Sequence, residues 1–112
     1  MQWGFQKNAG EGPQDSTTYY TFPLTITGVK ELSVIVSFYN SRVDSHRSSI
    51  TFYNADNDAE LLSLSTNTGE GSVSKSGVMD LTGVNTVKVK IWFWSWYAGP
   101  QSITLTDCTF KL

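Results

Sequence analysis

Three tryptophans alternate with other residues near the C-terminal end of the sequence. Trp92, Trp94 and Trp96 occupy even positions, each two residues from the next. In a β-strand, residues two apart point to the same side and lie about 7 Å from each other. An indole ring offers a flat apolar face, which suits the C–H face of a sugar ring, and an N–H edge that can hydrogen-bond. The spacing therefore predicts an aromatic platform that binds a sugar chain or another flat amphipathic surface.

The strand that would position this platform runs from residue 84 to residue 97. Its odd positions form an apolar stripe of Val87, Val89, Ile91 and Phe93. Lys88 and Lys90 share the even positions with the tryptophans, which marks that face as exposed to solvent. Soluble domains seldom leave such an aromatic patch exposed unless something binds to it. The alternative is that a loop or the N-terminal segment with Trp3 covers the indoles, or that a bulge near Ile91 turns two of them inward.

Polar side chains elsewhere in the sequence could complete a sugar site by binding hydroxyl groups. The segment 40–48 is a polar loop that could lie at the rim of the fold, although a solvated connecting loop is the alternative interpretation. The predicted ligand-binding residues are Trp92, Trp94, Trp96, Lys90, Tyr39, Arg42 and His46.

Alternation of apolar and polar residues with a period of two recurs along the whole chain, and helical periodicity is absent. Polar turn sequences at 54–58, 67–71 and 98–101 separate about eight strand-like segments. Many short strands with regular turn signals are typical of a two-sheet sandwich. The sequence thus predicts an all-β fold, a sandwich of about eight mostly antiparallel strands. The expected core residues are Val34, Val36, Phe38, Ile50, Phe52, Leu62, Leu64, Val87, Val89, Ile91 and Phe93.

Length and charge narrow the possible functions. A chain of 112 residues fits one domain, 1–112, and its net charge of −2 leaves no broad basic surface for nucleic acid. No apolar run of about 18 residues and no signal-peptide pattern is present, so we expect neither membrane insertion nor an export signal in this sequence. Because strand-like sequence follows Met1 directly, we expect the domain to be a part cut from a longer protein.

Catalytic chemistry has little support in the sequence. A glycosidase needs two carboxylates that face each other across a cleft, whereas Asp56, Asp58 and Glu60 cluster in a turn. One histidine and one cysteine cannot supply a tetrahedral zinc site, and no serine lies in a nucleophile-elbow pattern. We therefore expect no enzymatic activity.

Two segments share features with a known group of domains. Residues 80–84, Asp-Leu-Thr-Gly-Val, lead into the alternating segment 87–91, and the alternation of residues 103–110 is interrupted by Asp107. These features resemble a late strand and the closing strand of jelly-roll carbohydrate-binding modules and galactose-binding-like domains. Such domains occur on polysaccharide-degrading enzymes and on tail or baseplate proteins of bacteriophages, where they hold cell-surface glycans.

The resemblance implies a jelly-roll fold and a lectin-like, non-catalytic module that binds a polysaccharide or a cell-surface glycan. It also implies an extracellular place, within a secreted or virion protein, with neighbouring domains as further partners and host recognition as one role. The alternative is a structural or protein-interaction domain of a larger assembly, in which the same three indoles are buried at an interface.

The resemblance also implies a possible metal site at Asp107. In many such modules the acidic residue of the closing strand helps to bind a structural calcium ion, so Asp107 could do so with Glu11 or Glu31. Calcium requires six to eight oxygen ligands, and no calcium-loop signature accompanies these residues. We expect no other cofactor.

A β-bulge is the alternative explanation of Asp107. Ile103 and Leu105 occupy odd positions, whereas Cys108 and Phe110 occupy even ones. One extra residue between them would switch the parity, as it does in a bulge, without any metal. Cys108 would then be an inert thiol in the core.

Overall fold

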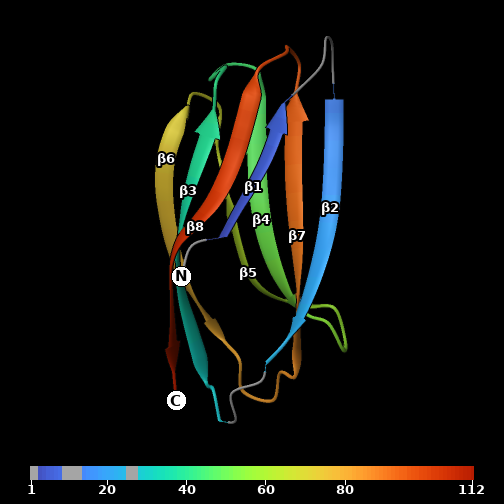
Figure 1. Cartoon of the computed structure of the whole chain (residues 1–112), viewed down its shortest axis with the longest axis vertical. Coiled ribbons are helices and arrows are strands. Elements are labelled where there is room, and N and C mark those ends of the chain that lie inside the picture. The colour runs from blue at the N-terminus through green and yellow to red at the C-terminus, as the bar shows by residue number, and fades with distance from the viewer. Residues whose placement is uncertain (1–2, 9–13, 25–27) are drawn as a thin grey trace.

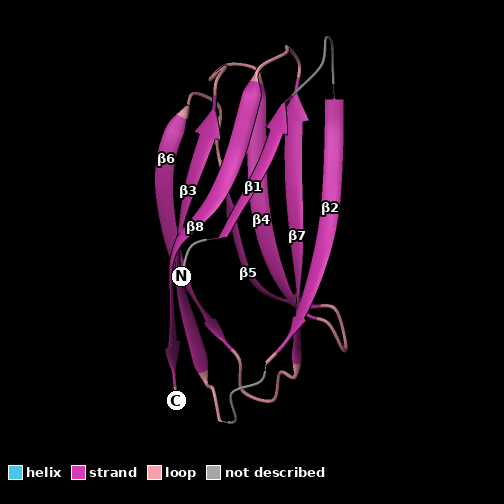
Figure 2. Ribbon diagram, viewed as in Figure 1, coloured by secondary structure: helices cyan, strands magenta, loops and turns pink. Residues whose placement is uncertain are grey.

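Eight strands and no helix make up the part of the chain that the computed structural model describes, residues 3–8, 14–24 and 28–112. The strands are β1 (Trp3–Asn8), β2 (Gln14–Pro23), β3 (Glu31–Asn40), β4 (His46–Asn54), β5 (Ala59–Ser65), β6 (Ser72–Asp80), β7 (Thr86–Ser95) and β8 (Pro100–Lys111). Figures 1 and 2 show them as two layers of long, nearly aligned strands. The prediction of an all-β fold with about eight strands is confirmed.

The strands form two antiparallel four-stranded sheets with the orders β1-β8-β3-β6 and β2-β7-β4-β5. We call them the β3/β8 sheet and the β4/β7 sheet. Only β4 and β5 are neighbours both in sequence and in a sheet, and every other connection crosses between the sheets. This order is that of a jelly roll, a β-sandwich built from two Greek keys. None of the described residues belongs to a helix that is long and apolar enough to cross a membrane.

The core lies between the sheets and follows the predicted alternation. The buried apolar residues of β7 are Val87, Val89, Ile91 and Phe93, and those of β3 are Leu32, Val34, Val36 and Phe38. Ile50 and Phe52 of β4 are buried between them. Leu62 and Leu64 pack against the core but stay half-buried, because β5 is an edge strand with no neighbour on one side.

A β-bulge interrupts β8, as the parity change in the sequence suggests. Ile35 of β3 pairs with Asp107, whereas the next residue, Val36, pairs with Leu105, so Thr106 is the extra residue. The Thr106 hydroxyl donates a hydrogen bond to the Ile35 carbonyl oxygen at 3.2 Å. The bulge switches the inward-facing positions of β8 from odd to even and thereby explains the break in the pattern at Asp107.

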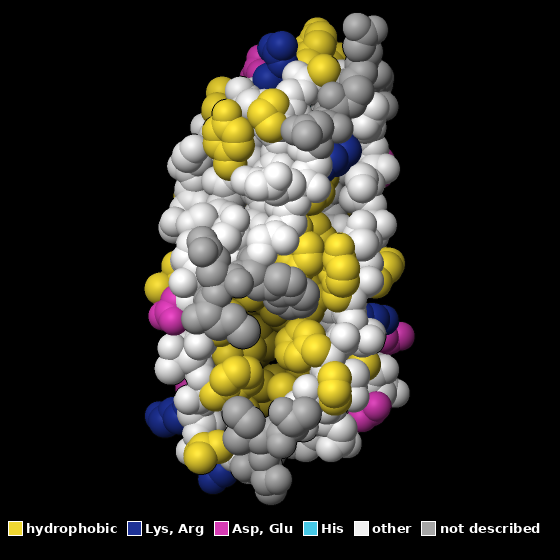
Figure 3. All heavy atoms as spheres, viewed as in Figure 1, with side chains coloured by type: hydrophobic (Ala, Val, Ile, Leu, Met, Phe, Trp, Pro, Cys, Tyr) yellow, Lys and Arg dark blue, Asp and Glu magenta, His cyan; other side chains and the backbone are white. Residues whose placement is uncertain are grey.

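Beyond the bulge, β8 is less well covered than before it. In the described part of the chain, β1 pairs with β8 only from Pro100 to Leu105. Cys108 therefore packs against the core while remaining half-buried, and Phe110 is exposed. Figure 3 shows apolar side chains reaching the surface in the lower half of this view. The expectation that Cys108 is a core thiol is thus met in part, since its side chain contacts the core but is only half-buried.

We predict that substitutions of an inward-facing and an outward-facing isoleucine will have very different effects. Ile91 is 2% exposed and Ile35 is 41% exposed, although both lie in interior strands. Ile91→Ala should lower the free energy of unfolding by about 3 kcal/mol, because it leaves a cavity in the core. Ile35→Ala should lower it by less than about 1 kcal/mol. Equal losses in urea titrations would contradict the assignment of the two faces.

We also predict that the Cys108 thiol reacts slowly in the folded protein. Burial, with a smaller contribution from the Asp107 carboxylate, raises the pKa of Cys108 above its usual value. Less thiolate is then present at about pH 8, and the thiolate is the nucleophile. Alkylation by iodoacetamide, followed by mass spectrometry, should be several-fold slower in the native chain than in urea. Similar rates in the two conditions would show that the thiol is freely accessible.

Candidate ligand-binding face

The outer face of the β4/β7 sheet carries Trp92 and Trp94. β7 is an interior strand with β2 on one side and β4 on the other, so its even residues point into solvent while its odd residues enter the core. Trp92 lies opposite Thr17 and Ser49. Trp94 follows two residues later on the same side of β7, and both indoles are half-buried. We call this surface the Trp face.

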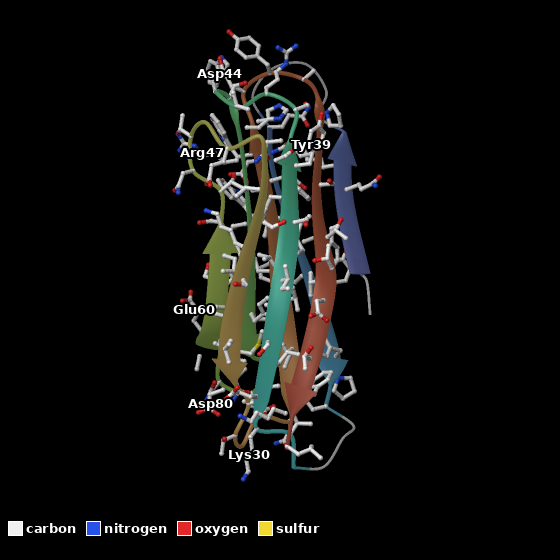
Figure 4. The ribbon with its side chains drawn as sticks, turned by 90° about the vertical axis from the view of Figure 1, so that its left-hand side faces the viewer. Lys30, Tyr39, Asp44, Arg47, Glu60 and Asp80 are labelled. Carbon is white, nitrogen blue, oxygen red and sulfur yellow. The ribbon has the colours of Figure 1, made fainter. Side chains whose placement is uncertain are left out.

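Trp94 is partly covered by a neighbour on β4. The guanidinium carbon of Arg47 lies 5.6 Å from the centre of the Trp94 ring, a cation–π distance. Arg47 also donates from Nη2 to the Thr68 hydroxyl at 2.9 Å, which holds the guanidinium over the ring. Figure 4 shows Arg47 at the upper end of the sandwich. The Trp94 ring therefore presents less free surface than the sequence suggests.

Trp92 is held by its edge. Its Nε1–H donates to Asp15 Oδ1 at 2.7 Å, which ties the indole toward β2. Within the described part of the chain, no aromatic or cationic side chain stacks on the Trp92 ring. A half-buried indole that is fixed at its edge and carries no aromatic or cationic partner from the described residues is a pre-organised surface for stacking.

Trp96 lies beyond the end of β7 and is not in line with the other two indoles. Its backbone N–H donates to the Ser45 carbonyl oxygen at 2.8 Å, and its side chain is 49% exposed. The neighbouring Tyr97 is exposed as well. The predicted row of three indoles is thus a pair on the Trp face and a third ring at the rim, because the strand ends at Ser95.

The other half of the Trp face holds two lysines and two tyrosines. Lys88 forms an ion pair with Asp58, whose carboxylate raises the pKa of Lys88. The Lys88 ammonium nitrogen also lies 5.6 Å from the ring centre of Tyr19 and 5.3 Å from that of Tyr53. Lys90, on the same side of β7 as Trp92, lies opposite Tyr19 and is half-buried.

Hydroxyl groups border the aromatic residues on this face. Ser49 of β4 lies between Trp92 and Ser65 of β5. In the next row, the Thr51 and Ser63 hydroxyl oxygens lie 3.0 Å apart. Indole rings beside hydroxyl donors and acceptors can accommodate both the apolar face and the hydroxyl groups of a sugar.

Tyr39 does not belong to the Trp face. It lies on β3, in the other sheet, between Ser72 of β6 and Ser102 of β8, and its side chain is 43% exposed. A shallow hollow of about 350 Å³ on that sheet is lined by Tyr39 and by hydroxyl-bearing residues such as Ser74 and Thr104. The structure therefore separates Tyr39 from the tryptophans by the thickness of the sandwich.

Arg42 and His46 take different places in the polar loop. Arg42 is exposed at the rim, where its Nε donates to the Ala98 carbonyl oxygen at 2.7 Å and its guanidinium lies 5.8 Å from the Tyr97 ring centre. His46 is only 1% exposed, and its Nε2 lies 2.7 Å from the Tyr97 carbonyl oxygen. His46 thus holds the rim from beneath and is not available to a ligand, contrary to the expectation from the loop sequence.

A buried glutamine supports the upper end of the Trp face. Gln101 Nε2 lies 3.0 Å from Asn40 Oδ1, 2.9 Å from the Arg47 carbonyl oxygen and 3.1 Å from the Trp94 carbonyl oxygen. One amide thus connects β8 to both β4 and β7. Gln101 is absent from the predicted site residues. Its position is nevertheless in phase with the inward-facing Ile103 and Leu105, which identifies it as a polar residue in a core position.

The described residues alone do not assemble the predicted calcium site. Asp107 is exposed, and the described residues contain no group of three or more His, Cys, Asp or Glu side chains that could hold a metal ion. Glu11 lies outside the described residues. Glu31 pairs with Lys111, four residues along β8 from Asp107. The bulge at Thr106 accounts for the acidic residue without a metal.

Known structures share this arrangement of strands. The carbohydrate-binding module TmCBM61, solved in complex with β-1,4-galactotriose, matches with a TM-score of 0.60 and 7% identity over 96% of this chain and 69% of its own. The chain shares the β-sandwich fold of this module. No family model matches the sequence, and no curated protein is detectably similar to it. At 7% identity the likeness establishes the fold, and the ligand has to be argued from the site.

Two further structures resemble the chain less closely. A carbohydrate-binding module of the β-sandwich superfamily has a TM-score of 0.45 and 10% identity, covering 99% of this chain and 54% of its own. The enzymatically active domain of bacteriophage CBA120 tailspike protein 4 has a TM-score of 0.45 and 11% identity, covering 98% and 19%.

We predict that Gln101→Met will destabilise the protein although it conserves side-chain size. The substitution leaves the three oxygen acceptors around Gln101 Nε2 without this donor in a buried site. The free energy of unfolding should fall by about 2 to 4 kcal/mol in urea titrations. Ser102→Ala, at the next position on the outer face, should change it by less than about 1 kcal/mol. A neutral Gln101→Met variant would mean that the amide does not tie the sheets together.

Proposed function

We propose that this chain is a non-catalytic carbohydrate-binding module whose ligand lies along the Trp face. The observation that carries the proposal is the placement of Trp92 and Trp94 side by side on an outer sheet surface, while their neighbours in sequence fill the core. The fold shared with TmCBM61, a module solved with a bound galactotriose, supports this proposal.

A sugar ring would stack on Trp92, which is half-buried and whose edge is fixed by Asp15. Stacking brings the C–H face of the sugar against the indole and leaves the hydroxyls at the ring periphery. Ser49 and Thr17, the cross-strand neighbours of Trp92, are placed to hydrogen-bond those hydroxyls. Trp94, with Arg47 over its ring, would contact the next part of the chain, and Trp96 would extend the surface at the rim.

The carboxylates of this face support a binding role over hydrolysis. Asp15 accepts the hydrogen bond from Trp92, and Asp58 pairs with Lys88. The two carboxylates contact the side chains of Trp92 and Lys88, which are four residues, about 13 Å, apart along the strand. The two carboxylates of a glycosidase lie within roughly 5 to 9.5 Å of each other. We further propose that the natural ligand is an extracellular polysaccharide or a cell-surface glycan. The chain would bind it as one domain of a larger secreted or virion protein.

Removal of the indoles tests the proposal. Trp92→Ala should weaken binding to a recognised glycan by about 1 to 3 kcal/mol, and Trp94→Ala and Trp96→Ala should weaken it in the same direction. Because Trp92 and Trp94 are half-buried, their loss should also cost about 1 to 2 kcal/mol of stability, less than the 3 to 5 kcal/mol typical of a core ring. Glycan arrays followed by calorimetry measure affinity, and urea titrations measure stability.

Tyr39→Ala is the matched control for these variants. Tyr39 is an exposed aromatic residue of the opposite sheet, so its loss should leave glycan affinity unchanged. A loss of affinity in Tyr39→Ala alone would move the site to the β3/β8 sheet. If no glycan binds and the Trp variants impair only association with a protein partner, the chain is an interaction domain and the proposal is wrong.

A further inference from the structure

The cations of the Trp face differ in whether they are already paired. Lys88 is engaged by Asp58 and by two tyrosine rings. Arg47 is engaged by the Trp94 ring and the Thr68 hydroxyl. Within the described part of the chain, Lys90 has no ion pair, side-chain hydrogen bond or ring contact. Lys90 is therefore the one uncompensated positive charge among these three.

Lys90 occupies the middle of the face. It lies opposite Tyr19 on β2 and Thr51 on β4, and it is two residues, about 7 Å, from Trp92 on the same side of β7. Its side chain is half-buried, and Thr51 beside it is buried. The Lys90 ammonium group presents a positive charge to which no carboxylate of the described residues is bonded. An anion that arrives with a ligand would pair with it.

The acidic residues near Lys90 are already engaged or lie toward the ends of the face. Asp15 lies opposite Trp94, four residues along β7 from Lys90, and is bonded to the Trp92 indole. Asp58 is paired with Lys88, and Glu60 lies opposite Tyr53, well below Arg47 in Figure 4. An anionic group of a ligand on the Lys90 side of Trp92 would therefore meet Lys90, whereas one at the Trp94 end would approach Asp15.

From this arrangement we infer that the Trp face selects an acidic glycan. A sugar ring stacks on Trp92, and a carboxylate or sulfate carried by that sugar or its neighbour accepts a charge-assisted hydrogen bond from Lys90 Nζ. This inference depends on the proposed carbohydrate-binding function and adds the ligand class. A neutral sugar would make the same stacking contact and leave Lys90 unpaired, so acidic and neutral chains of the same backbone should bind with different affinities.

The test uses ligand pairs that differ only in charge. Binding of the intact chain is measured by calorimetry to polygalacturonate and to its carboxyl-reduced, neutral form, and to dextran sulfate and unmodified dextran. We expect at least one acidic member to bind about tenfold or more tightly than its neutral counterpart. The preference should shrink between about 20 mM and about 300 mM NaCl, because partly exposed charges are screened. The pair that shows the preference identifies carboxylate or sulfate as the anion.

Lys90→Gln should abolish that preference while leaving the affinity for the neutral form within about twofold. Lys30→Gln is the control, because it removes the same charge from an exposed lysine at the far end of the sandwich (Figure 4) and should retain the preference. Trp92→Ala should weaken both members of a pair. The melting temperature of each variant confirms that it is folded.

Three results would overturn the inference in distinguishable ways. Equal binding of acidic and neutral forms that is lost in Trp92→Ala would refute the acidic preference and leave the carbohydrate-binding function intact. Equal effects of Lys90→Gln and Lys30→Gln would mean that the preference arises from the net charge of the protein and that Lys90 has no specific role. Absence of binding to any glycan would refute both the ligand class and the proposed function.

Discussion

The alternation of β7 is the constraint on which the rest of the structure depends. β7 is hydrogen-bonded on both sides, to β2 and to β4, so its register is held by two ladders at once. A shift of one residue would move Val89 and Ile91 into solvent and bury Lys88 and Lys90 in the core. The free-energy difference between these two registers is large, because apolar burial is lost and two charges are desolvated together. The register that buries Val89 and Ile91 in the core therefore also places the Trp face on the outer surface.

The upper end of this face depends on a second, polar constraint. Most of the core is apolar, but Asn40, Ser48, Thr66 and Gln101 form a buried hydrogen-bonded cluster where the strands end. Gln101 contributes contacts to the backbone of β4 and β7 directly behind Arg47 and Trp94. Such a network specifies one arrangement of the sheets more sharply than apolar packing does, although Gln101 Oε1 has no hydrogen-bond partner among the described residues. The position of the rim relative to the Trp face follows from it.

The two outer surfaces of the sandwich differ in chemistry although the sheets are alike in size. The β3/β8 sheet presents mainly hydroxyl groups, with Ser37 and Ser74 at 3.1 Å as a cross-strand pair. The β4/β7 sheet presents indoles, phenol rings and cations that contact one another. Because inward-facing residues are apolar in both sheets, folding places little restriction on the outward residues. The aromatic and cationic composition of one face is therefore more informative about function than the fold that carries it.

Several features of this protein were determined by the sequence alone. The period of two identified the strands, the buried side of β7 and the bulge near Asp107, because side-chain direction along a strand is a local property of the backbone. The same property placed Trp92, Trp94 and Lys90 on one face.

Only the tertiary structure decided which strands share a sheet, because strand pairing joins residues far apart in the sequence. That pairing moved Tyr39 to the opposite surface, left Leu62 and Leu64 at an edge and buried His46 beneath the rim. It also set Arg47 over Trp94 and, within the described ranges of the chain, gave Lys90 no ion-pair partner, an outcome that depends on cross-strand register. Local alternation tells which side of a strand a residue occupies, whereas its neighbours across the sheet depend on the packing of the whole chain.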